Sequence, residues 1–244
     1  MFQKLYLSCV LIVISKFYCF YRDDYKMTSL DKELFVFAGP NGSGKSTVIE
    51  NHLVNKMCPE VYICPDHLVA PEKKNDLAAY VEAMKQAETL RFKALEEEKS
   101  FTFETVFSTK DKLDFLMTAK RLGYHITTIY ITTSDPQINL NRIAERVKNG
   151  GHDVPSDKVL SRYEKTMRLM PEVLLKSDMA KVYDNSSSCP VLVFEKEECG
   201  DFLLLNREQR HSWVNKYITS YFDSNKIPIS QDLNVLQTEK LKGF

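Results

Sequence analysis

The chain of 244 residues has 43% hydrophobic and 27% charged side chains, with only 8 Gly and 9 Pro. This length fits one large domain or two small ones, and the composition excludes the disordered, collagen-like and low-complexity classes. The 33 Lys and Arg residues balance the 33 Asp and Glu residues, which predicts no bulk binding of nucleic acid along its phosphates.

The N-terminal segment is apolar from Leu5 to Tyr21 apart from Lys16, and a second methionine follows at Met27. Its uninterrupted apolar part is shorter than the roughly 20 residues that span a bilayer, and no small-residue cleavage site follows it. We interpret residues 1–26 as a dispensable leader or a mispredicted start, and a membrane or export element is the open alternative. Six scattered cysteines without a C-x-x-C pair fit a reducing compartment, so we expect a cytoplasmic protein without membrane attachment.

After Met27, short apolar or β-branched segments alternate with helical patterns, which is typical of a parallel sheet covered by helices. We expect strands at 34–38, 61–64, 101–104, 125–132, 182–183, 191–194 and 202–205. We expect helices at 46–55, 75–99, 113–122, 136–149, 156–170 and 208–221, with a short turn of helix between 170 and 177. In the helix at 75–99, spacing of three and four residues predicts one buried face, made of Leu77, Tyr80, Val81, Met84, Ala87, Leu90 and Ala94.

The segment G-P-N-G-S-G-K-S at 39–46 fits the pattern G-x-x-x-x-G-K-[ST] and lies between a buried strand and a helix. In that context the loop amides and the helix start surround an anion, the lysine reaches the outer phosphates and the serine hydroxyl binds Mg²⁺. We therefore expect ATP and Mg²⁺ as cofactors, with Ser46 as the metal ligand. The expected nucleotide contacts come from Gly39, Pro40, Asn41, Gly42, Ser43, Gly44, Lys45, Ser46 and Thr47.

The rest of the sequence favours a small-molecule kinase over a switch or a motor. It contains no N-K-x-D motif for guanine, and the strand at 125–132 does not end in the Asp-Glu pair of a hydrolysing ATPase. A kinase needs a base for the acceptor hydroxyl and positive charge around the transferring phosphoryl group. Asp66 and Glu104 follow two predicted strands, so we expect both carboxylates beside the phosphate loop at the carboxyl edge of the sheet.

Positive charge is expected from a lid at about 142–162. Arg142 and Arg146 lie one helical turn apart, and Arg162 follows a Gly150-Gly151 hinge. Closure of such a lid would carry arginines over the phosphates and expel water. Each arginine taken alone also fits a solvent-exposed role.

Several ordered motifs resemble the zeta toxin family of P-loop kinases. They are F-V-F-A-G-P-N-G-S-G-K-S-T at 35–47, P-D at 65–66, S-F-T-F-E-T-V-F-S at 100–108, R-I-A-E-R-V-K-N-G-G-H-D-V-P at 142–155, R-Y at 162–163 and V-Y-D-N-S at 182–186. The resemblance runs from about Leu34 to Ser186 and is closest to the short, chromosomal branch of that family.

This resemblance implies an α/β fold of the P-loop NTPase or kinase type, a three-layer sandwich with a mostly parallel central sheet and a helical lid. It also implies transfer of the γ-phosphate of ATP to a hydroxyl of UDP-N-acetylglucosamine, and an antitoxin protein as a partner. By position, Asp66 would be the base, Lys45 would hold phosphate, and Arg142, Arg146 and Arg162 would stabilise the transition state. Glu104 and Thr105 would contact the acceptor, Asp184-Asn185 would lie near the nucleotide, and Arg91 faces either the acceptor or solvent.

Two other functions remain open from the sequence. One is a kinase for another small metabolite or an RNA end, and the other is a nucleotide-dependent binding protein without kinase activity. We expect residues 27–186 to form the kinase core, and residues 187–244 to add strands and a helix to the same domain as a C-terminal appendage.

Overall fold

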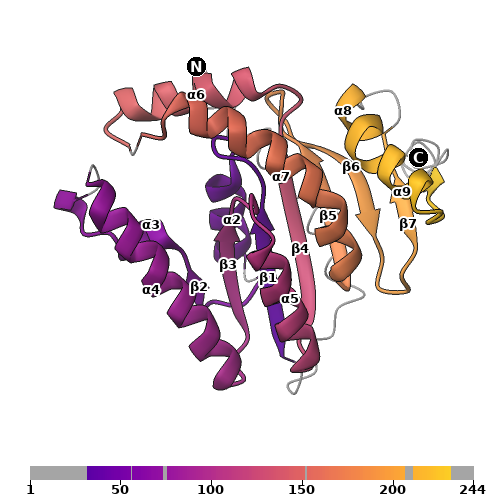
Figure 1. The fold of residues 1–244 in the computed structure, drawn as a ribbon, viewed down its shortest axis with the longest axis horizontal. Helices are drawn as coiled ribbons and strands as arrows, with labels where there is room; N and C mark the ends of the chain where they lie inside the picture. The colour runs from indigo at the N-terminus through magenta and orange to yellow at the C-terminus, as the bar shows by residue number, and fades with distance from the viewer. Residues whose placement is uncertain (1–31, 56, 74–75, 152, 207–210, 232–244) are drawn as a thin grey trace, which may run out of the picture.

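The computed structural model describes residues 32–55, 57–73, 76–151, 153–206 and 211–231 (Figure 1). The predicted leader at 1–26 and His152 in the predicted hinge lie outside these residues. No helix within the described ranges has the length and apolar character that crossing a membrane requires.

A single sheet runs through the described part of the chain in the order β2-β3-β1-β4-β5-β6-β7-β8. Strands β2, β3, β1, β4 and β5 are parallel, β6 and β7 each run antiparallel to the strand before them, and β8 pairs parallel with β7. Their bounds are β1 Glu33–Ala38, β2 Tyr62–Ile63, β3 Phe101–Thr105, β4 His125–Thr132, β5 Met179–Asp184, β6 Val191–Lys196, β7 Phe202–Leu204 and β8 Ser230–Gln231. The expected mostly parallel sheet is confirmed.

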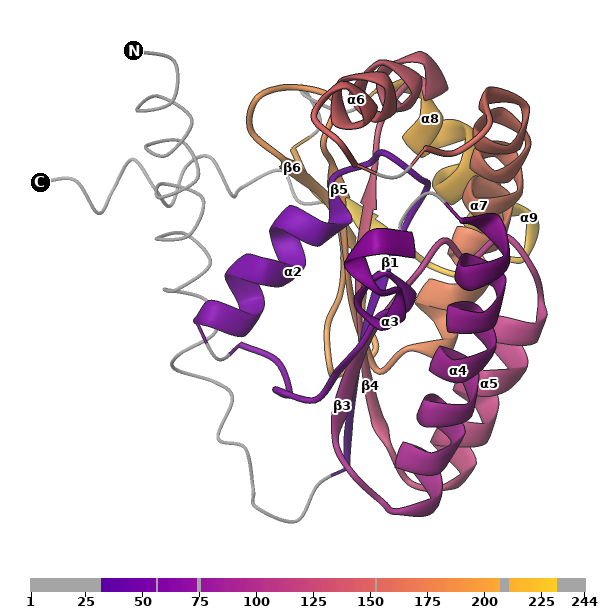
Figure 2. The same cartoon turned by 90° about the vertical axis from the view of Figure 1, so that its left-hand side faces the viewer.

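Helices cover both faces of this sheet, which gives the three layers expected from the sequence. Figure 2 shows α2 on one face and α4, α5 and α7 on the other. The helices are α2 Lys45–Val54, α3 Pro65–Leu68, α4 Leu77–Glu96, α5 Asp111–Arg121, α6 Pro136–Lys148, α7 Ser156–Lys176, α8 Ser212–Val214 and α9 Ser220–Ser224, with a 3₁₀ turn at Pro71–Lys73 and a π-helical segment at Asn215–Thr219.

Strand β1 is central because its side chains are buried on both faces of the sheet. Leu34 and Val36 join the large core beneath α4, α5 and α7, whereas Phe35 and Phe37 pack with Ile49 of α2. Alternating side chains of one strand thus fill two cores, as a parallel strand between helical layers requires. This burial fixes the position of the loop that leaves β1 at Ala38.

The buried face of α4 differs from the prediction. Val81, Met84 and Leu90 are exposed, at 46%, 53% and 40%, and the buried face is made of Ala83, Ala87, Arg91, Ala94 and Leu95. The guanidinium of Arg91 lies 5.3 Å from the ring centre of Phe103 and 5.9 Å from that of Phe115. The prediction is confirmed for Ala87 and Ala94 and wrong for the three larger apolar residues. Alanines let the helix approach the core closely, and Arg91 supplies the bulk between them, so the largest apolar residues do not mark the buried face.

Helix α7 is continuous from Ser156 to Lys176, whereas the sequence predicts a break near Met170. Pro171 lies inside the helix, where it removes one backbone hydrogen bond. Met167, Met170, Val173 and Leu174 on both sides of Pro171 are fully buried. Packing of this face keeps the helix intact across the proline.

Candidate active site

The phosphate loop connects β1 to α2 and passes close to neighbouring strands. Gly39 has φ +144°, and a Cβ atom there would lie 1.9 Å from the carbonyl oxygen of Ile131 in β4. Gly44 has φ +93°, and a Cβ atom there would lie 2.5 Å from Nδ2 of Asn185. Both positions therefore require glycine, because any side chain meets strained backbone and occupied space.

Two asparagine side chains from distant parts of the sequence hold this loop. Nδ2 of Asn139, in α6, donates a hydrogen bond to the carbonyl oxygen of Asn41 at 2.6 Å. Nδ2 of Asn185, which follows β5, donates to the carbonyl oxygen of Ser43 at 2.8 Å. Sequence reasoning placed Asn185 near the nucleotide but missed Asn139, because one asparagine in an amphipathic helix carries no motif.

Lys45 is the buried cation of the site. Its Nζ atom donates to the carbonyl oxygens of Gly39 and Pro40, at 2.9 and 2.8 Å, and lies 3.9 Å from Oε1 of Glu104. Burial lowers the pKa of Lys45, and the carboxylates of Glu104 and Asp66 oppose that effect by their negative charge. Arg146 is close enough to lower the same pKa further.

The loop lysine, two carboxylates and one arginine therefore come together at the carboxyl edge of the sheet. Glu104 lies near the end of β3, beside β1 in the register Phe37↔Glu104. Asp66 lies in the first turn of α3, directly after β2. Arg146 reaches the group from the last turn of α6. The convergence predicted from the strand order is present in the structure.

Two tyrosines hold the carboxylates, and the sequence analysis did not identify either as a site residue. Tyr62 donates its hydroxyl to Oε2 of Glu104 at 3.0 Å, and Tyr80 hydrogen-bonds Asp66. Burial raises the pKa of both tyrosines, so they remain neutral donors. Tyr62 pairs with Thr102, two residues before Glu104, so the pleat places both side chains on one face of the sheet.

The three predicted arginines have different surroundings. Arg142 donates through Nη2 to the carbonyl oxygen of Asn185 at 2.7 Å, which places it beside the phosphate loop. Arg146 lies near Lys45 and Tyr80. Arg162 is half-buried on α7 and has no hydrogen-bond or ion-pair partner in the described part of the chain. The structure thus brings Arg142 and Arg146 to the site and gives Arg162 no contact there.

The remaining predicted contacts lie on the rim of the site. Ser46 and Thr47 are exposed in the first turn of α2. Thr105 ends β3, where its hydroxyl accepts a hydrogen bond from the amide of Phe107 at 3.3 Å. Asp184, by contrast, is buried and forms its contacts within the protein.

Unpartnered polar atoms indicate that these residues fit a nucleotide. Oδ1 of Asn41, Oγ of Ser43 and Nη1 of Arg142 are buried without a hydrogen-bond partner among the described residues. Such atoms are costly in a folded protein unless a ligand or water satisfies them. Two of these atoms, Oγ of Ser43 and Nη1 of Arg142, are donors in and beside the phosphate loop, which matches an anionic ligand such as a triphosphate.

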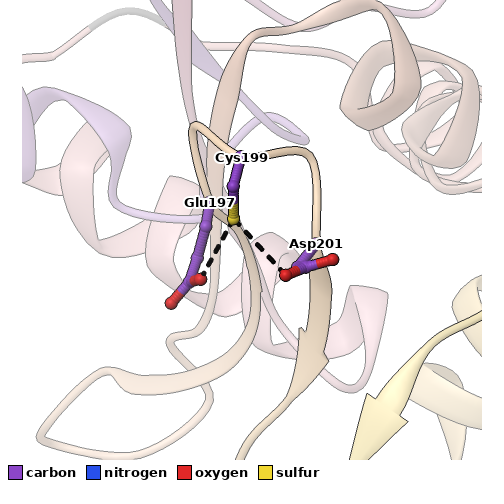
Figure 3. Close-up of side chains that lie close together, drawn as sticks. All are labelled: Glu197, Cys199 and Asp201. Atoms are coloured by element: carbon purple, nitrogen blue, oxygen red, sulfur yellow. Dashed lines mark hydrogen bonds between the residues drawn. The ribbon is translucent and has the colours of Figure 1, made fainter.

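A second group of polar side chains lies on the turn between β6 and β7. The thiol of Cys199 donates to Oε2 of Glu197 at 3.5 Å and to Oδ2 of Asp201 at 3.4 Å (Figure 3). All three side chains are exposed. Because Lys196 pairs with Ala180 near the start of β5, this turn lies at the opposite edge of the sheet from the phosphate loop. The exposed cluster does not belong to the candidate site.

Comparison with known proteins supports a shared fold. The family described as "AAA domain" matches residues 34–170. An uncharacterized protein of Haemophilus influenzae is 31% identical over 139 residues, which make up 57% of this chain and 97% of that protein.

Two solved structures extend the comparison beyond the family match. One is from the PezAT chromosomal toxin–antitoxin system of Streptococcus pneumoniae, with 15% identity, a TM-score of 0.52 and coverage of 96% of this chain and 93% of that chain. The other is the AvrRxo1-ORF1:-ORF2 complex with ATP, with 15% identity, a TM-score of 0.60 and coverage of 84% and 67%. The fold expected from the sequence resemblance is therefore shared with a structure from a toxin–antitoxin system.

Proposed function

The chain belongs to the AAA domain family, and we propose that it is a phosphotransferase that moves the γ-phosphate of ATP to a hydroxyl of a small molecule. The observation that carries this proposal is the gathering of Asp66, Glu104 and Arg146 around Lys45. Such a site offers a proton acceptor and positive charge beside one phosphate loop, which are the two requirements of phosphoryl transfer to an alcohol.

In the proposed step, the acceptor hydroxyl gives its proton to the carboxylate of Asp66. The acceptor oxygen forms a bond to the γ-phosphorus while the bond from that phosphorus to the β,γ-bridging oxygen breaks, and ADP leaves. Lys45 and Arg146 stabilise the charge that develops on the phosphoryl and leaving oxygens. Tyr80 holds the Asp66 carboxylate toward the acceptor by its hydrogen bond.

The nucleotide would be held by the loop from Gly39 to Thr47, with the hydroxyl of Ser46 as the protein ligand of Mg²⁺. When bound, the ion neutralises negative charge on the phosphate oxygens. Arg142 is proposed to contact the phosphates through its unpartnered Nη1 atom, and Arg162 to reach them only if the lid at about 142–162 moves.

We propose UDP-N-acetylglucosamine as the acceptor and an antitoxin protein as a partner. The sequence resemblance described above supports both, and the similarity of the fold to a structure from a toxin–antitoxin system supports the antitoxin partner. Glu104 would accept hydrogen bonds from sugar hydroxyls, because Tyr62 fixes one of its oxygens and leaves the other directed toward Lys45. Thr105 is proposed as a second acceptor contact.

The test is transfer from labelled ATP to a panel of acceptors with Asp66→Asn, and with Asp114→Asn as the matched control on the exposed side of α5. We expect Asp66→Asn to bind ATP normally and to lose transfer by about two powers of ten or more, as removal of a positioned base does. The control should transfer like the wild type. Wild-type rates in Asp66→Asn would remove the base from the mechanism, and absence of transfer to every acceptor would contradict the proposed activity.

A further inference from the structure

The carboxylate of Asp184, at the end of β5, connects the C-terminal helical segment (residues 211–224) to the sheet. Its Oδ2 atom accepts hydrogen bonds from Nδ1 of His211 at 2.6 Å and from Nε1 of Trp213 at 2.7 Å. Its Oδ1 atom accepts from the amide of Ser186 at 2.9 Å and from the hydroxyl of the same residue. Asp184 is only 2% exposed, so these protein donors are what keeps its charge stable inside the fold.

The next residue, Asn185, is the one that touches the phosphate loop. Its backbone amide donates to the carbonyl oxygen of Thr132 at 2.7 Å, and its side chain donates to the carbonyl oxygen of Ser43 at 2.8 Å. Its own carbonyl oxygen accepts from Arg142 at 2.7 Å. A single peptide unit therefore joins the buried carboxylate to a residue that contacts both the phosphate loop and Arg142.

We propose that the C-terminal helical segment is part of the nucleotide site, and that His211 and Trp213 are positioning residues that hold Asn185 against the phosphate loop through the buried carboxylate of Asp184. This inference rests on the nucleotide-binding half of the proposed function and is independent of the acceptor. It gives the C-terminal appendage, which contains no chemical motif, a role in shaping the site.

The segment is rigid enough to act in this way because it is packed into the large core. Trp213, Val214, Ile218 and Phe222 are all buried there, with Val214, Ile218 and Phe222 fully so. His211 differs, since half of its side chain is exposed. Its substitution therefore removes a donor to Asp184 without opening a cavity in the core, which makes it the most informative position for a test.

The experiment compares His211→Ala, which removes the donor, with His211→Asn, whose amide nitrogen can take the place of Nδ1. Trp213→Phe removes the second donor and keeps an aromatic ring. Asn225→Ala is the control. It removes a hydrogen bond at the end of this segment, from Nδ2 of Asn225 to the carbonyl oxygen of Tyr221 at 2.8 Å, which does not reach Asp184. Binding of Mg²⁺-ATP and of inorganic tripolyphosphate is measured by calorimetry, and thermal unfolding is recorded for each variant.

We expect His211→Ala and Trp213→Phe to weaken the binding of both probes by about fivefold to tenfold. His211→Asn should restore binding, and Asn225→Ala should leave it unchanged. Loss of thermal stability with unchanged binding of both probes would overturn the proposal and leave a purely structural role. Weaker binding of ATP with unchanged binding of tripolyphosphate would also overturn it, because His211 would then act on the nucleoside. Neither probe needs an acceptor, so failure of phosphotransfer would leave this test intact.

Discussion

Replacement of Gly44 by alanine tests whether the phosphate loop and Asn185 are as close as the structure indicates. The added methyl group would lie 2.5 Å from Nδ2 of Asn185, at a backbone φ of +93°. Gly123 is a matched control, because its φ of +82° is similar and a Cβ atom there would meet nothing within 4 Å. The two substitutions share the backbone strain, so their difference measures the crowding alone.

The magnitudes follow from these distances. We expect Gly123→Ala to lower the free energy of unfolding by about 1 to 2 kcal/mol, the cost of a left-handed backbone for an alanine. Gly44→Ala has the same backbone strain and also forces the Asn185 side-chain amide away from Ser43, which loses one partly buried hydrogen bond worth about 1 kcal/mol. Gly44→Ala is therefore expected to cost about 2 to 3 kcal/mol in total.

A double-mutant cycle isolates the contact between the two residues. In an Asn185→Ala background the methyl group added at Gly44 has space, and no hydrogen bond to Ser43 remains to be lost. The double variant should therefore lose about 1 kcal/mol less free energy of unfolding than the two single variants lose in sum. Urea unfolding followed by circular dichroism gives each free energy, provided that the m-value is unchanged. Additivity within about 0.5 kcal/mol, or equal costs at Gly44 and Gly123, would refute the close approach.

Two further predictions concern the helical layer and the acceptor side. Met84→Gln on the exposed side of α4 should change the free energy of unfolding by less than about 0.5 kcal/mol. Ala87→Gln should lower it by about 2 kcal/mol or more, because it overpacks a fully buried position. Equal urea midpoints for the two variants would contradict the observed buried face. Burial raises the pKa of the Cys64 thiol from 9.0 to about 11. Because only the unfolded thiol ionises readily between these values, the wild type should lose about 2 kcal/mol of stability relative to Cys64→Ala as the pH rises from 9 to 11. Parallel pH profiles of the urea midpoint for the two proteins would argue against this burial.

The sequence determined the parts of this protein that local chemistry encodes. The strand at 34–38 is apolar at every position because it is buried on both faces, and Gly39 after it is required where the loop approaches β4. Asp135-Pro136 starts α6, with the Asp135 side chain accepting a hydrogen bond from the amide of Gln137 at 2.8 Å. These signals lie within a few residues of one another, so they were sufficient to predict the fold class and the phosphate loop.

Only the tertiary structure decided which distant side chains meet. Tyr62 and Glu104 are 42 residues apart, and Asp184 and His211 are 27 apart, so no spacing in the sequence predicts either contact. The buried face of α4 was predicted only in part for the same reason, since Arg91 is buried because Phe103 and Phe115 offer it their rings. Side-chain convergence depends on strand order, register and the packing of helices on the sheet, which the whole chain determines together.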